Sequence, residues 1–421
     1  MLSRVLIGLG FALALVACSA ELIQAPPAVG PQDSTALPNL ADSSVSPVVT
    51  AMVAQTSTTA PSIQEKPEPV VRDCTSLRDN AALSIEANLL IETGEGDAIV
   101  DLTTGQQRIL PRSLQGGIPS LDGSALMIPG QGLFTVYSET GLAISATIPT
   151  PFHIPQQLSN GEYLIRENRA LDSSGLNPAL EEVWIITENG PVPTVSPFEV
   201  KAPEFFARSL PAFVSHFTYN APFTHALYGW EDLNGHRGMR LWNIADEKVV
   251  WERVWNYSVS WSGSDWAPDG SGFVVSIPAL LPDGQAQSRP ELMLISVDGH
   301  ESTLSRLNNS FAPGTSYAMQ AVAWSPTGER VAVIVTADLL HPYTSASLYM
   351  VDLKGTQVID LCVPVLRPAL ELKWSPDGNW LAFESTDGHG VTVLDVRGNS
   401  VLYLNVPTSV SQVKGWLSWV P

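Results

Sequence analysis

The sequence predicts an all-β fold, a seven-bladed β-propeller whose blades are four-stranded antiparallel sheets. Three observations predict it. First, an apolar stretch, a short polar turn and a second apolar stretch recur seven times, about every 36 to 57 residues. Second, three of the later copies are preceded by a Trp-bearing segment that ends in a turn of Pro–Asp–Gly type. Third, the chain ends on a Trp-bearing segment that no repeat follows.

The seven copies share an apolar strand, a polar turn that usually holds glycine, and an apolar continuation. They begin at Ile99, Thr135, Trp184, Leu241, Met293, Tyr349 and Val393. Because spacings of this size are typical of stacked or radial repeats, the copies predict one repeating unit along almost the whole folded part of the chain.

A second turn marks the start of each unit. It is clear at Trp266–Gly270, Trp324–Gly328 and Trp374–Gly378, and weaker at Ser120–Gly123 and Leu158–Gly161. Proline presets φ for the second turn position, and glycine accepts the left-handed fourth position, which is typical of a hairpin with a bulge. Each unit is therefore expected to contain strand, turn, strand, variable loop, strand, polar turn and strand.

The two ends of the repeat region complement each other. The first repeat, around residues 88–111, lacks a Trp-bearing strand before it, and Val413–Pro421 is such a strand without a repeat. We expect the C-terminal strand to pair beside residues 88–111 and close the ring, which hides the exposed sheet edges of an open array. The region from Leu210 to Arg253 shows no clear turn signature, so a propeller with six or eight blades is the alternative.

The N-terminus predicts export. Arg4 precedes an apolar run that is too short to span a membrane, and the sequence Leu15-Val16-Ala17-Cys18 resembles a bacterial lipoprotein signal. The resemblance implies removal of residues 1–17 and a lipid on Cys18, which would anchor an extracytoplasmic protein to a membrane of the cell envelope. An ordinary signal peptide with a chance cysteine is the alternative.

Residues 18–72 are poor in aromatics and rich in Pro, Ser and Thr, which predicts a disordered tether ahead of a propeller domain at 73–421. With Cys18 lipidated, Cys74 and Cys362 are an even pair in an oxidising compartment, and we expect a disulfide between them. Two unpaired, buried thiols are the alternative. The net charge of −20 and the lack of a basic stripe exclude nucleic acid as an expected partner.

At the three Trp-(Ser/Ala)-Pro-(Asp/Thr)-Gly motifs, the chain resembles the TolB-type, WD-repeat-like propellers of bacteria. The periodicity extends this resemblance over residues 75–421. Such propellers serve as periplasmic scaffolds, as sensor domains and as gating domains of peptidases, so the resemblance implies an architecture and no reaction.

Motifs of catalysis are missing from the sequence. It holds no Gly-x-Ser-x-Gly, no His-Glu-x-x-His, no phosphate-binding glycine loop and no calcium loop. His216, His225 and His236 fall in one expected blade, but their spacing fits no known ligand pattern. We therefore expect neither a metal nor a cofactor.

The loops between the second and third strands predict a binding surface. They are short in blades two and seven and long in blades three to six, at 168–181, 229–238, 277–290 and 336–346. Loops on a rigid scaffold often carry binding residues. The candidates are Asp172, Asn177, Trp230, Glu231, Asp232, His236, Arg237, Gln285, Arg289, His341 and Tyr343.

The functional expectation is a monomeric, lipid-anchored scaffold that binds an envelope protein or a glycan through these loops. Loops that merely vary in length, with no partner, are the structural alternative. The functional alternative is a propeller-type glycan hydrolase or lyase, with Glu231, Asp232 and His236 over the central channel. An enzyme should show several titratable groups that converge in one pocket, whereas a scaffold should show a broad mixed surface.

Overall fold

The structure is a computed structural model in which the chain divides into two compact units, Met1–Gln64 and Glu65–Pro421. All residues that it describes belong to the second unit. They are residues 71–72, 76–77, 85–130, 132–148, 153–167, 183–187, 190–194, 213–231, 237–255, 263–280, 286–305, 307, 317–336, 346–354, 357–365, 371–384, 390–397, 400–406 and 409–420. A search of these residues finds no helix with the length and apolar character that crossing a membrane requires.

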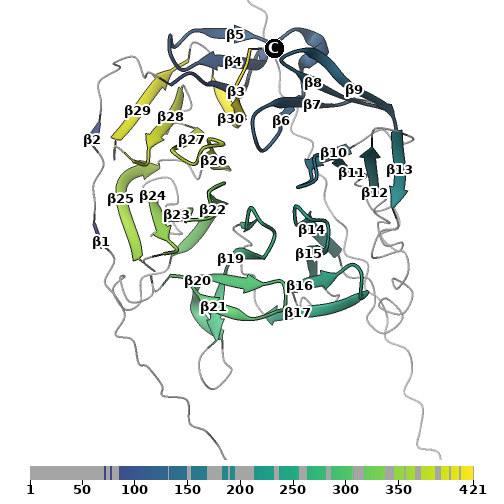
Figure 1. The fold of residues 1–421 in the computed structure, drawn as a ribbon. Helices are drawn as coiled ribbons and strands as arrows, with labels where there is room; N and C mark the ends of the chain where they lie inside the picture. Colours follow the sequence, from purple (N-terminus) through teal and green to yellow (C-terminus); the bar gives the residue numbers. More distant parts are fainter. Residues whose placement is uncertain are drawn as a thin grey trace, which may run out of the picture. The chain divides into compact units, whose positions relative to one another are not determined.

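In this part of the chain the strands form seven antiparallel sheets of four strands, the blades of a propeller (Figure 1). Blade one holds β30 (Val410–Leu417), β3 (Asn88–Thr93), β4 (Gly96–Asp101) and β5 (Gln107–Ile109). Blades two to four hold β6 (Ile118–Pro119), β7 (Ala125–Pro129), β8 (Leu133–Ser138), β9 (Gly141–Thr147); β10 (His153–Gln157), β11 (Tyr163–Glu167), β12 (Val183–Thr187), β13 (Gly190–Thr194); and β14 (Phe213–Tyr219), β15 (His225–Glu231), β16 (Arg237–Asn243), β17 (Lys248–Trp255).

Blades five to seven hold β18 (Ser264–Trp266), β19 (Gly272–Leu280), β20 (Ala286–Ser296), β21 (Glu301–Thr303); β22 (Ala318–Trp324), β23 (Arg330–Thr336), β24 (Ala346–Asp352), β25 (Gln357–Val365); and β26 (Lys373–Trp374), β27 (Trp380–Glu384), β28 (Gly390–Asp395), β29 (Ser400–Asn405). Arg112–Leu114 form a 3-10 helix, η1. The predicted fold class and the count of seven blades are confirmed, and six or eight blades are excluded.

The turns between the first and second strands repeat one hydrogen-bond pattern. In blades two to seven the amide of the fourth turn residue donates to the carbonyl of the first. The first residues are Ser120, Leu158, Asn220, Ala267, Ser325 and Ser375. The two weak turn signatures of the sequence are therefore real turns, as are the three clear ones.

Blade four has the turn that its sequence does not reveal. Asn220 opens it, and the Asn220 Oδ1 accepts the backbone N–H groups of Thr224 and His225 at 2.8 and 2.9 Å. Phe223 takes the fourth position with a φ of 55°, where other blades have glycine. A left-handed phenylalanine costs conformational energy. Its ring lies 5.1 Å from that of Tyr219, a contact that offsets part of this cost.

The C-terminal strand closes the ring as the sequence predicts. β30 pairs antiparallel with β3, from Asn88 opposite Leu417 to Thr93 opposite Val410 (Figure 1). Lys414 of β30 also forms an ion pair with Asp97 of β4, at 2.8 Å between Nζ and Oδ1, and Asp97 is only 3 % exposed. Blade one is thus built from both ends of the repeat region.

Neighbouring blades pack face to face through apolar clusters. One cluster joins blades six and seven through Ile334, Leu348 and Phe383, and another joins blades seven and one through Val393 and Leu89. These strands are apolar at consecutive positions because both of their faces are buried.

Two short strands extend the outer edges of blades six and seven. β1 (Val71–Arg72) pairs in parallel with β25, and β2 (Ser76–Leu77) pairs in parallel with β29. Cys362 of β25 is disulfide-bonded. Cys74, its expected partner, lies outside the described residues, as does Cys18.

Candidate binding site in the central channel

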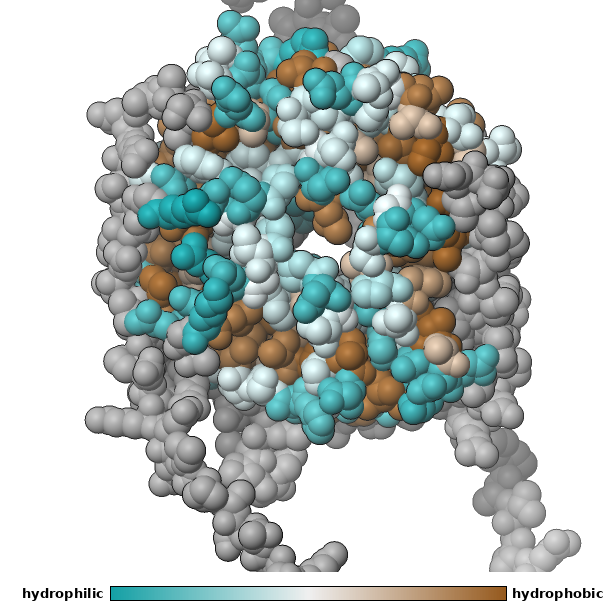
Figure 2. Space-filling view, in the orientation of Figure 1, coloured by the Kyte–Doolittle hydropathy of each residue, from teal (hydrophilic) through white to brown (hydrophobic). Residues whose placement is uncertain are grey.

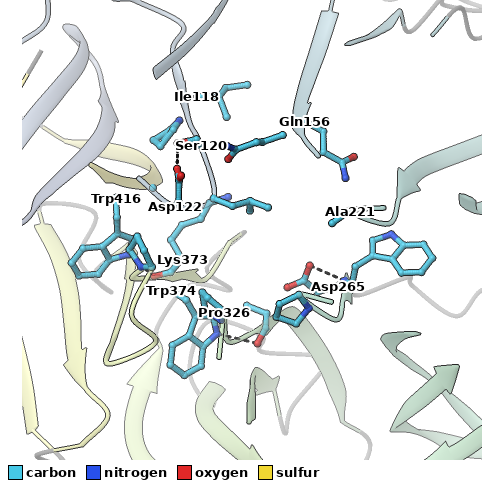
Figure 3. Close-up of a pocket in the computed structure, with 18 of the residues that line it drawn as sticks. Ile118, Ser120, Asp122, Gln156, Ala221, Asp265, Pro326, Lys373, Trp374 and Trp416 are labelled. Carbon is cyan, nitrogen blue, oxygen red and sulfur yellow. Dashed lines mark hydrogen bonds between the residues drawn. The ribbon is translucent and has the colours of Figure 1, made fainter. Parts of the chain in front are cut away.

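The innermost strands of all seven blades surround one cavity of about 620 Å³. One lining residue per blade lies at an equivalent place. In blades two to seven it is the second residue before the turn, and in blade one it is the residue before Trp416. These residues are Ile118, Gln156, Thr218, Asp265, Ala323, Lys373 and Gly415. Figure 3 shows Gln156, Asp265 and Lys373 around the same opening. The volume lies within the range of small-ligand pockets.

The cavity belongs to one end of the channel. Its lining comes from the ends of the inner strands and from the first turns, so we call this end the turn face, and the opposite end the loop face. Leu121, Ala221, Pro268, Pro326 and Pro376 occupy the second turn position and form an apolar rim, in which Leu121 is 71 % exposed. The channel stays open in the space-filling view, with hydrophilic and hydrophobic residues both further out (Figure 2).

Indole groups connect the inner strands around the channel. The Nε1 of Trp266 donates to Thr218 Oγ1 at 3.0 Å, that of Trp374 to the Ala323 carbonyl at 3.1 Å, and that of Trp416 to the Lys373 carbonyl at 2.8 Å. Each bond runs from one blade to the equivalent residue of the blade before it. These tryptophans therefore join neighbouring blades.

The seam between blades five and six departs from this pattern. The buried Nε1 of Trp324 has no hydrogen-bond partner among the described residues. The backbone N–H of Trp324 donates instead to Asp265 Oδ2 at 2.7 Å. Just before it, β22 changes register, and Ala321 has a φ of 49°. At this seam the hydrogen bond between the blades therefore joins the Asp265 carboxylate to a backbone N–H group, and the indole takes no part in it.

Asp265 is held by backbone donors rather than by a cation. Its Oδ1 accepts the N–H of Trp266 at 2.9 Å. Burial raises the pKa of Asp265 to about 6, against the two backbone N–H groups and the positive charge of Lys373, which lower it. Asp265 forms no ion pair with any described residue, so its negative charge is incompletely compensated.

The other charged groups at the cavity have partners of their own. Lys373 pairs with Glu371 at 2.5 Å, and Lys414 pairs with Asp97. Asp122 accepts hydrogen bonds from Ser120 Oγ and from Ser124. Burial opposes ionisation of Asp122, but these donors outweigh it and hold its pKa below the usual value.

The structure describes only four of the residues predicted to bind, and only through their backbone. Trp230 and Glu231 end β15, Arg237 begins β16, and Arg289 lies in β20. The remaining candidates lie outside the described residues, namely Asp172, Asn177, Asp232, His236, Gln285, His341 and Tyr343. All these positions belong to second-to-third-strand connections and hence to the loop face, whereas the cavity belongs to the turn face.

Two of the expected long loops are at least half strand. In blade four, pairing continues to Glu231 opposite Arg237, and in blade five to Leu280 opposite Ala286. The expected loops at 229–238 and 277–290 shrink to 232–236 and 281–285. The sequence overestimated them because Gly229, Pro278 and Pro290 interrupt the strand pattern without ending the pairing.

Sequence reasoning missed the cavity itself. Its residues lie about 50 positions apart and form no motif, but a fixed offset from each turn identifies them. No cluster of three or more His, Cys, Asp or Glu suited to a metal ion occurs among the described residues.

Comparisons with known proteins show similarity to solved propellers. No family model matches the chain, and no curated protein matches it. Hydrazine synthase of Kuenenia stuttgartiensis is 14 % identical, with 80 % of this chain and 99 % of that chain covered and a TM-score of 0.42. A putative TolB of Agrobacterium tumefaciens is 16 % identical, with 70 % and 96 % covered and a TM-score of 0.38.

The Cps50 (Swd1) β-propeller domain of Myceliophteria thermophila is 14 % identical, with 78 % of this chain and 98 % of that domain covered and a TM-score of 0.46. With identities and TM-scores this low, the assignment of the fold depends on the strand pairing described above. Nothing about the activity of this chain follows from these three proteins.

Proposed function

We propose that this protein is a lipid-anchored, extracytoplasmic scaffold that holds an extended segment of an envelope protein in the mouth of its channel. The observation that carries the proposal is the cavity at the turn face, which inner strands from all seven blades surround. A ring built from seven blades is rigid, and rigid concave sites favour binding because little ordering is needed.

The rim favours a protein segment over a glycan. Leu121 and three exposed prolines surround the opening, and indoles lie behind them. Apolar and aromatic groups at the centre with polar groups outside are typical of protein–protein contacts.

The chemistry of the cavity supports binding over catalysis. Asp122, Lys373 and Lys414 each contact a separate partner, and Asp265 contacts two backbone amides. A hydrolase or lyase needs an acid and a base that face one reacting bond. No two of the described carboxylates in the cavity share a hydrogen bond. For this reason we favour a binding protein over a glycan hydrolase or lyase.

A bulky residue in the rim tests the binding site. We expect Ala221→Trp to fill the mouth and abolish partner capture from native envelopes, while the propeller stays folded because only backbone atoms of Ala221 bond to blade three. Thr140→Trp, in an exposed turn of blade two, is the matched control. Equal capture by wild type and both variants would place the partner elsewhere.

Membrane attachment is tested separately. We expect Cys18→Ser to move the protein from the membrane fraction to the soluble fraction and to remove labelling by a radioactive fatty acid. Retention on membranes with no fatty-acid label in either form would disprove the lipid anchor and leave the channel proposal untouched.

A further inference from the structure

Two carboxylates line the cavity, Asp122 and Asp265, and neither forms an ion pair with a described residue. Burial raises the pKa of Asp265, whereas at Asp122 the effect of burial is outweighed by serine donors, which lower its pKa. Outside the cavity lining, Asp97, Glu301 and Glu252 form ion pairs with Lys414, Arg253 and Arg240. Asp265 has no such partner among the described residues, although it lines the channel (Figure 3). A charge without a partner in partly buried surroundings is costly, and groups of this kind are concentrated at functional sites.

The surroundings of Asp265 suit a cation. Its two backbone donors, the N–H groups of Trp266 and Trp324, leave further lone pairs of the carboxylate available. The same two tryptophans line the cavity. A positive charge is attracted to the face of an indole ring. On the elements next to β18, the cavity lining contributes Thr218 and Tyr219 from β14 and Ala323 from β22, none of them charged at neutral pH.

We propose that Asp265 is the recognition group for a basic side chain, lysine or arginine, of the segment that enters the channel. This inference rests on the proposed function and names the chemistry of the partner. The protonated nitrogen would supply the counter-charge that Asp265 lacks, in a charge-assisted hydrogen bond. The net charge of −20 would draw a basic segment toward the molecule over a longer distance.

The positive charge of Lys373 opposes the binding of a cation at Asp265. Lys373 is the charged group of the cavity whose field reaches Asp265, and its ammonium is paired with Glu371. A cationic ligand at Asp265 therefore meets the repulsive charge of Lys373. Removing that charge should strengthen binding, whereas removing the Asp265 charge should weaken it. Opposite effects of two variants cannot come from general damage to the fold.

The experiment is a titration of labelled protein with three capped tripeptides, Ala-Lys-Ala, Ala-Arg-Ala and Ala-norleucine-Ala, followed by NMR at the indole signals of Trp266 and Trp324. We expect millimolar binding of the lysine or arginine peptide and binding of the norleucine peptide that is weaker by roughly tenfold or more. Asp265→Asn should weaken cation binding by roughly tenfold, Lys373→Met should strengthen it about threefold, and the exposed-turn control Asp269→Asn should leave it unchanged.

Acidity provides an independent readout. Binding of the cation requires ionised Asp265, so the affinity should fall as the pH decreases through about 6. Equal binding of the charged and norleucine peptides would overturn the inference, as would full cation binding by folded Asp265→Asn. If partner capture still depends on Ala221 in that case, the proposed function stands and only the chemistry assigned to Asp265 fails.

Discussion

Asp265 carries a carboxylate in surroundings that disfavour its negative charge. Burial raises its pKa to about 6, and the backbone around it is irregular, with a register change in β22 and an orphaned indole N–H at Trp324. Natural sequences break local rules mainly at functional sites. Asn or Ala at this position would remove the buried charge, so its presence favours a role in binding.

The raised pKa predicts how stability depends on pH. The folded-state pKa lies above the unfolded value of 3.8, so folding takes up a proton between these values. The Asp265 contribution to the free energy of unfolding is therefore fully present below about pH 4 and is lost as the pH rises through about 6. As the pH rises from about 4 to about 6, the free energy of unfolding of wild type should fall by about 2 kcal/mol relative to that of Asp265→Asn.

Urea denaturation of both proteins at about pH 4.5 and pH 7.5 measures this difference, because other titrating groups cancel in the comparison. A stability difference that does not change with pH would show that Asp265 has an ordinary pKa. Its place in the cavity would then no longer imply an uncompensated charge.

Individual residues also show where sequence reasoning was insufficient. The turn of blade four was missed because Phe223 takes the position of glycine and Asn220 supplies the side-chain acceptor. Asp265 was missed because it precedes Trp266 in a strand and belongs to no motif. Its importance depends on six other residues that only the closed ring brings together.

At the scale of elements, β30 is the strand on which closure depends. It joins β3 through backbone pairing and β4 through the pair of Lys414 with Asp97. The Asp97 carboxylate also accepts the N–H of Gly116. The ion pair is therefore nearly buried and connected on both sides, unlike the exposed pair of Lys248 with Asp246.

Breaking this ion pair should destabilise the closure. We expect Lys414→Met to lower the free energy of unfolding by about 3 kcal/mol, because Asp97 would remain buried without its cation. Lys248→Met, at the exposed pair, should cost less than about 0.5 kcal/mol. The double variant Lys414→Met/Asp97→Asn should recover part of the loss, and equal costs for Lys414→Met and Lys248→Met would refute a special role for the buried pair.

Strands and turns were predictable to the extent that their chemistry is local. The Pro–Asp–Gly turns and the terminal closing strand were foreseen because each depends on a few adjacent residues. β1 and β2 were not, since each pairs only two residues and their pairing partners lie about 300 positions away. The lengths of β15 and β20 were underestimated because sheet pairing overrides a local glycine or proline.

For the whole molecule, closure creates both the core and the channel. Each blade buries its faces only against its two neighbours, so an open ring leaves blades one and seven with an exposed apolar face. Deleting residues 410–421 should therefore abolish cooperative unfolding and cause aggregation. A synthetic peptide of residues 410–421 added in trans should restore part of the cooperative transition, measured by near-ultraviolet circular dichroism. A truncated protein that unfolds like wild type would contradict this dependence.

The loop face and the turn face of the ring are two different candidate binding sites. The sequence directed attention to the loop face, where chain length varies, whereas the cavity belongs to the turn face. Variable loop length is visible in a sequence, but a concave site made from one residue per blade is not. The two interpretations place the partner at opposite ends of one channel, so they can be separated by position alone.

The most direct test is site-specific photo-crosslinking of the full-length protein in its native cells. A photoreactive residue at Leu121, on the channel rim, is compared with one at Leu142, an equally apolar residue that is 58 % exposed in the outermost strand of the same blade, and with one at Arg237 on the loop face. Our account predicts a discrete crosslinked partner from Leu121 that is absent from the other two. Crosslinking from Arg237 with none from Leu121 would contradict it.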